Sequence, residues 1–315
     1  MDDYEDFDVP ATQSAGRLIT FLDNTGVTMT SHAECKGKHK GTGDYDVSQE
    51  AIDPATVRGT GKLDKKNPQG KVRCYFFQAN DPSMLPSHFA AVAPKSLAEF
   101  DKVNIFFHPA PDHADPPMTV DDYPDLGTWA PLFRYMPILG AQLAGSGKAQ
   151  LLIMPYVPSR MFATTGQFAQ KWRSIVTGLA KYIKYDLTGA QDNSLSVSSV
   201  IVSSFSWGIK ASDGFRTNAG GLNSVLQEIW DFDGMFSQEK QKSVALRNTQ
   251  RPRLIQYQQA LPTLANSFNV GPTRWTDIDP TLTKLMKTDA VKAGKAVHRN
   301  VPMLFYHACE TSAIG

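Results

Sequence analysis

Short apolar runs alternate with longer amphipathic stretches over the part of the chain that follows residue 70. Seven of these runs have the length of a β-strand and are bounded by polar or turn-forming residues: 72–78, 103–108, 149–156, 196–204, 225–231, 253–258 and 302–307. Between the third and fourth runs, residues 167–187 place Phe168, Trp172, Ile175 and Leu179 at helical spacing. This spacing predicts an amphipathic helix whose apolar face packs on the core. Strands that alternate with helices predict an α/β fold, with a mainly parallel sheet flanked by helices.

The polar pattern divides the chain into three parts. Residues 1–15 are acidic and are expected to be a disordered tail. Residues 16–70 are polar and rich in turn formers, with a strand-like piece at 18–22, and predict an antiparallel β extension. Residues 71–315 would form the α/β domain. Within it, the Pro- and aromatic-rich segment 111–145 is long for a connection, so it is expected to be a lid or binding insertion, or else a pair of surface helices.

Composition places the protein among ordinary globular proteins. Of 315 residues, 41% are apolar and 20% charged, and the net charge of +1 gives no reason to expect a nucleic-acid partner. No apolar run reaches the roughly 18 residues that a membrane-spanning helix needs. The acidic start is unlike a secretory signal, and three scattered cysteines fit a reducing compartment. We therefore expect a cytoplasmic or otherwise soluble protein.

The run at 196–204 leads into the sequence Ser204-Phe205-Ser206-Trp207-Gly208, followed by residues able to start a helix. A serine between a strand and a helix can sit on a sharp turn that exposes its hydroxyl. Small residues are needed two positions before and after it, and Ser204 and Gly208 meet this need. The pattern predicts that Ser206 is a nucleophile.

A nucleophilic serine needs a general base that is oriented by an acid. After Ser206, the run at 225–231 ends in Asp231 and is followed by Asp233, whereas the run at 302–307 ends in His307. We prefer Asp233 to Asp231 as the acid because it lies beyond the strand. We prefer His307 to His298 as the base because it would follow the last strand. Other acids in the right part of the chain are Asp277 and Asp279.

Over roughly residues 70–315, the chain resembles the α/β-hydrolases in its serine turn, in the order of its strands and in the placement of Asp and His. The resemblance implies an oxyanion hole made of the Trp207 N–H and a second donor near Ala110, with His108 contacting substrate or capping the loop. It implies no cofactor and no metal. The chain departs from the family's pattern in three places: glutamines at 256 and 258 where the acid usually follows, His108-Pro109 at the oxyanion turn, and little chain beyond His307 for a closing helix.

Residues 229–236 also resemble the Asp-x-Asp-Gly motif of haloacid-dehalogenase-type phosphatases, with Asp231 as nucleophile. Too little chain follows for the rest of that motif set, so this alternative is the weaker one. Residues 145–149 resemble a phosphate-binding loop only in part, since a glycine and the Ser/Thr are missing. Two further groups could in principle ligate a metal, although each is more simply a solvated loop: His32, Cys35 and His39, and Asp112, His113 and Asp115.

The sequence thus predicts a serine hydrolase that cleaves a carboxylic ester through an acyl-enzyme. The apolar insertion at 111–145 favours a small-molecule or lipid ester as its partner. The alternative is a hydrolase-like scaffold without activity that serves in binding, with the basic part of 16–70 as its working surface. The sequence does not indicate an oligomeric state.

Overall fold

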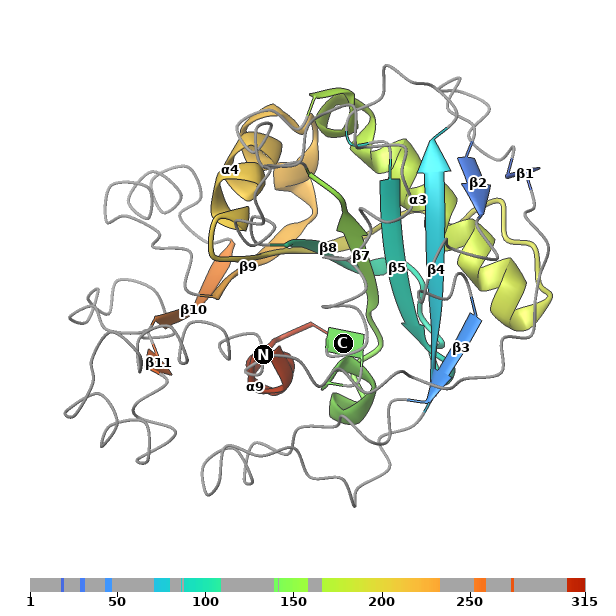
Figure 1. Ribbon diagram of the computed structural model, residues 1–315, viewed down its shortest axis with the longest axis horizontal. Coiled ribbons are helices and arrows are strands. Elements are labelled where there is room, and N and C mark those ends of the chain that lie inside the picture. The colour runs from blue at the N-terminus through green and yellow to red at the C-terminus, as the bar shows by residue number, and fades with distance from the viewer. Residues whose placement is uncertain are drawn as a thin grey trace, which may run out of the picture.

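The computed structural model describes residues 18–19, 29–31, 43–46, 71–79, 86, 88–108, 139–140, 142–157, 166–232, 252–258, 273–274 and 305–314. These residues form a mixed, mostly parallel β-sheet with helices packed on it, which is an α/β fold (Figure 1). Eleven strands belong to the described part of the sheet: β1 Leu18–Ile19, β2 Met29–Ser31, β3 Gly43–Asp46, β4 Lys71–Ala79, β5 His88–Pro94, β6 Lys102–Phe107, β7 Leu151–Pro155, β8 Ser199–Phe205, β9 Leu226–Phe232, β10 Arg253–Gln258 and β11 Thr273–Arg274.

The strands lie in the order β1-β2-β4-β5-β7-β6-β8-β9-β10-β11, and β3 pairs with β4 outside this path. Strand β5 runs antiparallel to both of its neighbours, β4 and β7. From β7 through β11 every neighbouring pair is parallel. Strand β8 therefore lies inside the sheet, between β6 and β9, with the carboxyl ends of all three at one edge.

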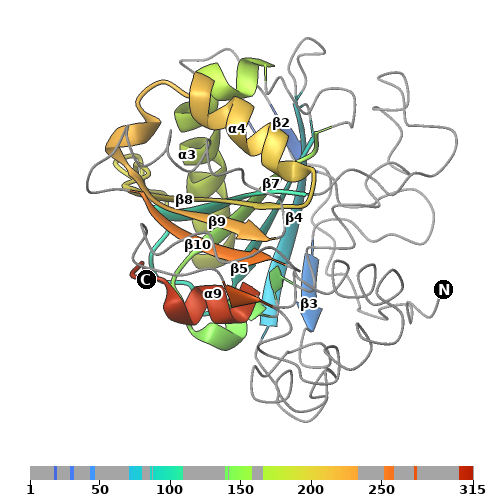
Figure 2. The ribbon, with the colours of Figure 1, turned by 90° about the vertical axis from the view of Figure 1, so that its left-hand side faces the viewer.

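Helices cover the two faces of the sheet (Figure 2). On one face lie α3, which spans Gly166–Thr188, and α4, which spans Gly208–Asn218. They enclose the main core with alternate residues of the strands, for example Ile105 of β6 and Ile229 of β9. Helix α9, which spans Phe305–Thr311, packs on the other face. There the ring of Phe305 packs against three aromatic rings of the sheet, those of Phe106, Trp230 and Phe232.

Helix α3 is held at its carboxyl-terminal part by charged and polar groups of the sheet. The hydroxyl of Tyr75 donates a hydrogen bond to Asp186 Oδ2 at 2.9 Å, and Arg73 Nε lies 2.6 Å from the same oxygen. Burial, together with the nearby Asp186 carboxylate, raises the pKa of Tyr75 far above its usual value. The phenol therefore stays neutral and remains a hydrogen-bond donor to α3.

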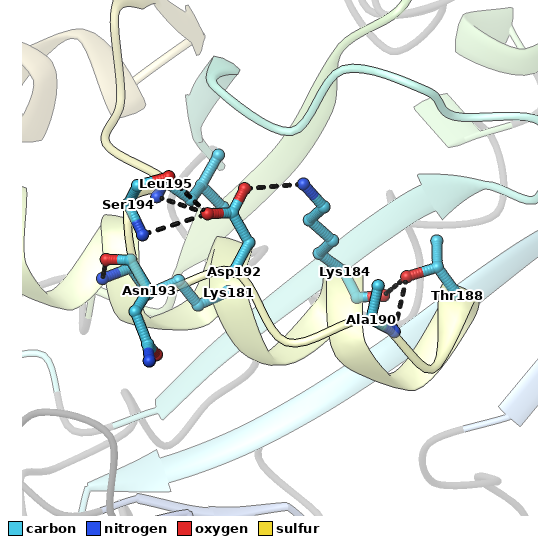
Figure 3. A network of polar contacts seen from close by, with 8 residues as sticks. All are labelled: Lys181, Lys184, Thr188, Ala190, Asp192, Asn193, Ser194 and Leu195. Atoms are coloured by element: carbon cyan, nitrogen blue, oxygen red, sulfur yellow. Dashed lines mark hydrogen bonds and ion pairs between the residues drawn. The ribbon is translucent and has the colours of Figure 1, made fainter.

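The connection from α3 to β8 is built around Asp192 (Figure 3). Its Oδ1 accepts hydrogen bonds from the backbone N–H groups of Ser194 and Leu195 and from the Ser194 hydroxyl, and its Oδ2 lies 2.7 Å from Lys184 Nζ. The hydrogen bonds from Lys184 and Ser194 hold the pKa of Asp192 well below its usual range. The ionised Asp192 side chain thus stabilises the turn that connects α3 to β8.

Most of the predicted elements are confirmed. The strands predicted at 72–78, 103–108, 149–156, 196–204, 225–231 and 253–258 correspond to β4, β6, β7, β8, β9 and β10, and the predicted helix corresponds to α3. The described strands of residues 16–70 pair antiparallel with one another or with β4, so they extend the same sheet. The acidic tail at 1–15 and most of the 111–145 insertion lie outside the described residues.

Two predictions were incomplete or wrong. Strand β5 was not predicted, although every one of its residues is buried. The strand predicted at 302–307 is wrong over its second half, because Phe305 begins α9. The last described strand is instead β11, which pairs with β10. Residues 305–311 form the short helix α9, where the sequence was expected to leave little room for a helix.

Candidate functional site

Ser206 lies at the turn between β8 and α4, in a backbone conformation that is rare for its residue type. Its φ is 53°, and it is the only non-glycine residue with positive φ in the described part of the chain. Side chains are disfavoured in this left-handed region because Cβ approaches the backbone. Two hydrogen bonds hold the turn: the Ser206 N–H donates to Phe232 O at 3.0 Å, and the Ile209 N–H donates to Ser206 O at 3.1 Å. A strained conformation of this kind persists only where the surrounding structure holds it, and such positions are common at functional sites.

Gly208 allows α4 to start directly against the carboxyl end of β6. A Cβ at this position would lie 2.2 Å from the carbonyl oxygen of Phe107 and 2.6 Å from that of His108. Both are backbone atoms, so no side-chain rotation could relieve the contact. On the other side of the turn, Ser204 is fully buried. The predicted need for small residues on both sides of Ser206 thus has a direct structural reason.

Helix α4 begins at Gly208, two residues after Ser206. Trp207 precedes the helix and no side chain caps it, and its first turn holds no acidic residue. The Trp207 N–H has no acceptor among the described residues. The first N–H groups of a helix are unsatisfied and carry partial positive charge. In α4 the N–H groups of Ile209 and Lys210 already donate to Ser206 O and Trp207 O, so the Trp207 N–H is the group suited to stabilise negative charge that develops next to Ser206.

His108 is held by the two residues that directly follow strand β7. Its ring is fully buried and its Nε2 accepts a hydrogen bond from the Val157 N–H at 3.0 Å. It also stacks on Tyr156, with ring centroids 5.2 Å apart. In the neutral imidazole, the proton is therefore on Nδ1. This arrangement matches the loop-capping alternative of the sequence analysis more closely than a contact with substrate.

Asp231 lies inside β9 rather than beyond it. In the register of the sheet it pairs with Ser204 of β8, two residues before the level of Ser206. It is fully buried, on the same side of the strand as Ile229, which is the face that α3 and α4 cover. A fully buried carboxylate is poorly placed to attack a phosphate, which argues against the phosphatase alternative.

Most of the other predicted site residues cannot be compared with the sequence analysis, because they lie outside the described part of the chain. Asp233, His298 and Ala110, as well as Asp277 and Asp279, lie outside the described residues. His307 lies in the first half of α9, and its side chain is likewise outside the description. The reason given for preferring His307, that it ends the last strand, is wrong because the residue is helical. The choice between His307 and His298 stays a prediction.

Metal and phosphate sites find little support in the described residues. They contain no group of three His, Cys, Asp or Glu side chains that could hold a metal ion, and the two loops considered for metal binding lie outside them. In the loop at 145–149, Lys148 Nζ donates to Ser312 O at 3.2 Å, so the lysine binds this chain's own backbone. None of the described helices is both long and apolar enough to cross a bilayer.

A charged residue beside the serine turn was missed by the sequence analysis. Lys210 Nζ lies 3.7 Å from the ring centroid of Trp207. The signal was present in the sequence, since residues three apart in a helix face the same side. It was missed because Trp207 precedes the helix, so that its side-chain direction depends on the turn at Ser206.

Comparison with known proteins does not assign the chain to a family: no family model matches it, and no curated protein is detectably similar.

Proposed function

We propose that this protein is a serine hydrolase of the α/β-hydrolase type that cleaves carboxylic esters, with Ser206 as the nucleophile. The observation that carries the proposal is the strained turn itself. Ser206 has a φ of 53° between a buried strand and a helix, with Gly208 pressed against the end of β6. A serine on such a strand–helix turn is the arrangement that exposes a nucleophilic hydroxyl above a parallel sheet.

The strand order supports the same proposal. Counted from β4, the sheet runs first, second, fourth, third, fifth and onward to the eighth strand, and only the second strand is antiparallel. This is the strand order of the α/β-hydrolases, in which the nucleophile follows the fifth strand. Here the fifth strand is β8, which ends immediately before Ser206. The local turn and the overall topology therefore point to the same residue.

In the proposed mechanism, the Ser206 hydroxyl attacks the ester carbonyl while a histidine, His307 or His298, accepts its proton. The Trp207 N–H and a second donor near Ala110 would stabilise the negative charge on the carbonyl oxygen. The same histidine then gives the proton to the departing alkoxide. Water, deprotonated by the histidine, attacks the acyl-enzyme and releases the carboxylic acid and Ser206. No cofactor takes part in these steps.

The acid that orients the histidine is proposed to be Asp233, with Asp231 as the alternative. Asp231 is fully buried and pairs with Ser204, before the level of the nucleophile. Asp233 follows the last residue of β9, whose carbonyl accepts the hydrogen bond from the Ser206 N–H. Asp233 directly follows the residue that bonds Ser206, whereas Asp231 precedes that residue inside the strand. This difference favours Asp233.

The test is labelling of the purified protein with a fluorophosphonate probe, combined with turnover of p-nitrophenyl esters of short and long acids. We expect labelling that disappears in Ser206→Ala. As a matched control, Ser224→Ala removes an exposed hydroxyl in the connection between α4 and β9 and should label normally. If folded wild-type protein neither labels nor turns over any ester, the proposal fails and the binding scaffold becomes the better interpretation.

A further inference from the structure

Trp207 directly follows the proposed nucleophile in the chain and is exposed to solvent. Its exposed fraction is 53%, and the only other exposed large hydrophobic residue in the described part of the chain is Tyr185 on α3, at 41%. One exposed aromatic ring alone means little. Trp207 differs because it directly follows Ser206 in the chain, at the turn where the substrate would be attacked. Its ring is available as an apolar contact for the substrate.

Lys210 adds a positive charge to this surface. Its ammonium lies over the Trp207 ring, 3.7 Å from the centroid, where the attraction between cation and aromatic face holds it. It has no carboxylate partner among the described residues. The nearest acidic residue on α4, Asp213, is paired with Arg216. Among the described residues, the Lys210 cation in the first turn of α4 thus has no carboxylate partner, and it lies over the ring of Trp207, which follows Ser206.

We infer that Trp207 and Lys210 form a subsite that selects esters bearing a carboxylate on the acyl chain. This inference rests on the proposed function of Ser206. The apolar part of such a chain would lie along the exposed indole, and its carboxylate would pair with the Lys210 ammonium. A cationic substrate would be repelled by Lys210. A neutral chain would gain only the apolar contact with Trp207.

The experiment compares two substrates with similar chains, p-nitrophenyl butyrate and mono-p-nitrophenyl glutarate, which differ in a terminal carboxylate. In wild-type protein, we expect kcat/KM for the glutarate ester to exceed that for the butyrate ester. Lys210→Gln should lower the ratio of kcat/KM for the glutarate ester to that for the butyrate ester about fivefold, mainly through KM for the glutarate ester. Lys210→Glu should reverse the preference. Added salt should reduce the wild-type preference, because exposed charges are screened.

The matched control is Lys95→Gln, which changes net charge equally at the opposite edge of the sheet. Lys95 follows β5, whose last residue pairs with Val72 near the start of β4. We expect it to leave the ratio of the two substrates unchanged. Equal kcat/KM for both esters in wild type, or an equal loss of both in Lys210→Gln, would overturn the subsite. Absence of Ser206-dependent labelling would instead overturn the proposed function, so the two failures can be told apart.

Discussion

Gly208 is the position where the structure makes its sharpest demand on residue type. In Gly208→Ala, the new methyl group would start 2.2 Å from Phe107 O, whereas contacts shorter than 3.4 Å are already tight. The new Cβ would clash with a backbone oxygen, so no side-chain rotation could relieve the contact. Helix α4 and the end of β6 would therefore have to separate by about 1 Å. Overpacking of this kind costs about 1–3 kcal/mol. The better helix propensity of alanine offsets at most about 1 kcal/mol of it.

The same displacement should affect activity more strongly than stability. It would move the Trp207 N–H and the Ser206 hydroxyl relative to the end of β6, and a misplacement of about 1 Å can cost about 100-fold in rate. We expect Gly208→Ala to lower the free energy of unfolding in urea by about 1–2 kcal/mol and the rate of fluorophosphonate labelling by about 100-fold. The control is Gly220→Ala, where a Cβ meets nothing within 4 Å. If the two variants unfold and label alike, the reasoning about the turn is refuted.

Three further perturbations test other parts of the structure. Ser206→Gly should be about 1 kcal/mol more stable in urea than Ser206→Ala, because glycine accepts the φ of 53° without strain; equal stabilities would mean that the turn is relaxed. Glu228 is 1% exposed and accepts hydrogen bonds from Trp230 Nε1 and the Ala313 N–H. Glu228→Ala should therefore lower the free energy of unfolding in urea by about 3 kcal/mol and make residues 312–314 accessible to proteolysis. Resistance to proteolysis equal to that of wild type would contradict the role of Glu228 in holding these residues. Because the folded pKa of Asp192 is lowered, its stabilisation is present above the unfolded value of 3.8 and is lost as pH falls below it. Wild type should therefore exceed Asp192→Asn in urea midpoint at about pH 7, with the difference narrowing at about pH 3, and a pH-independent difference would contradict this.

The elements that local pattern determines were predictable from the sequence. The run before Ser206, the small residues at 204 and 208 and the helical residues after them together predict a strand, a tight turn and a helix, as the structure has them. Each of these signals acts over a few residues. The same holds for α3, whose apolar stripe is long enough to distinguish a helix from a strand.

The missed elements lack such a signal. Strand β5, His88-Phe89-Ala90-Ala91-Val92-Ala93-Pro94, is rich in alanine, which has low strand propensity, and it shows no alternation because both faces are buried. The run that ends in Phe305-Tyr306-His307 is too short for its periodicity to separate strand from helix. In both cases, pairing and packing with distant residues decide the structure.

The candidate site likewise has one part that the local sequence predicts and another part that depends on distant contacts. The turn at Ser206 was predicted from its neighbours in the chain, whereas its observed conformation is also held by Phe232 O of β9 and by the backbone at the end of β6. The role of His108 depends on Val157, which lies 49 positions further along the chain, and could not be read from the loop alone. The acid and the base depend on how segments after β9 return to Ser206, and local sequence patterns do not determine such long-range contacts.

The aromatic contacts of α9 join segments that are far apart in the sequence. Phe305 closes one face of the sheet by packing on Phe106, Trp230 and Phe232, which come from segments far apart in the sequence. Contacts between distant segments form late, because the loops between them must first close. Removal of α9 would take away the Phe305 ring that covers these three side chains. We therefore expect a chain that stops before residue 305 to aggregate more readily than the full chain.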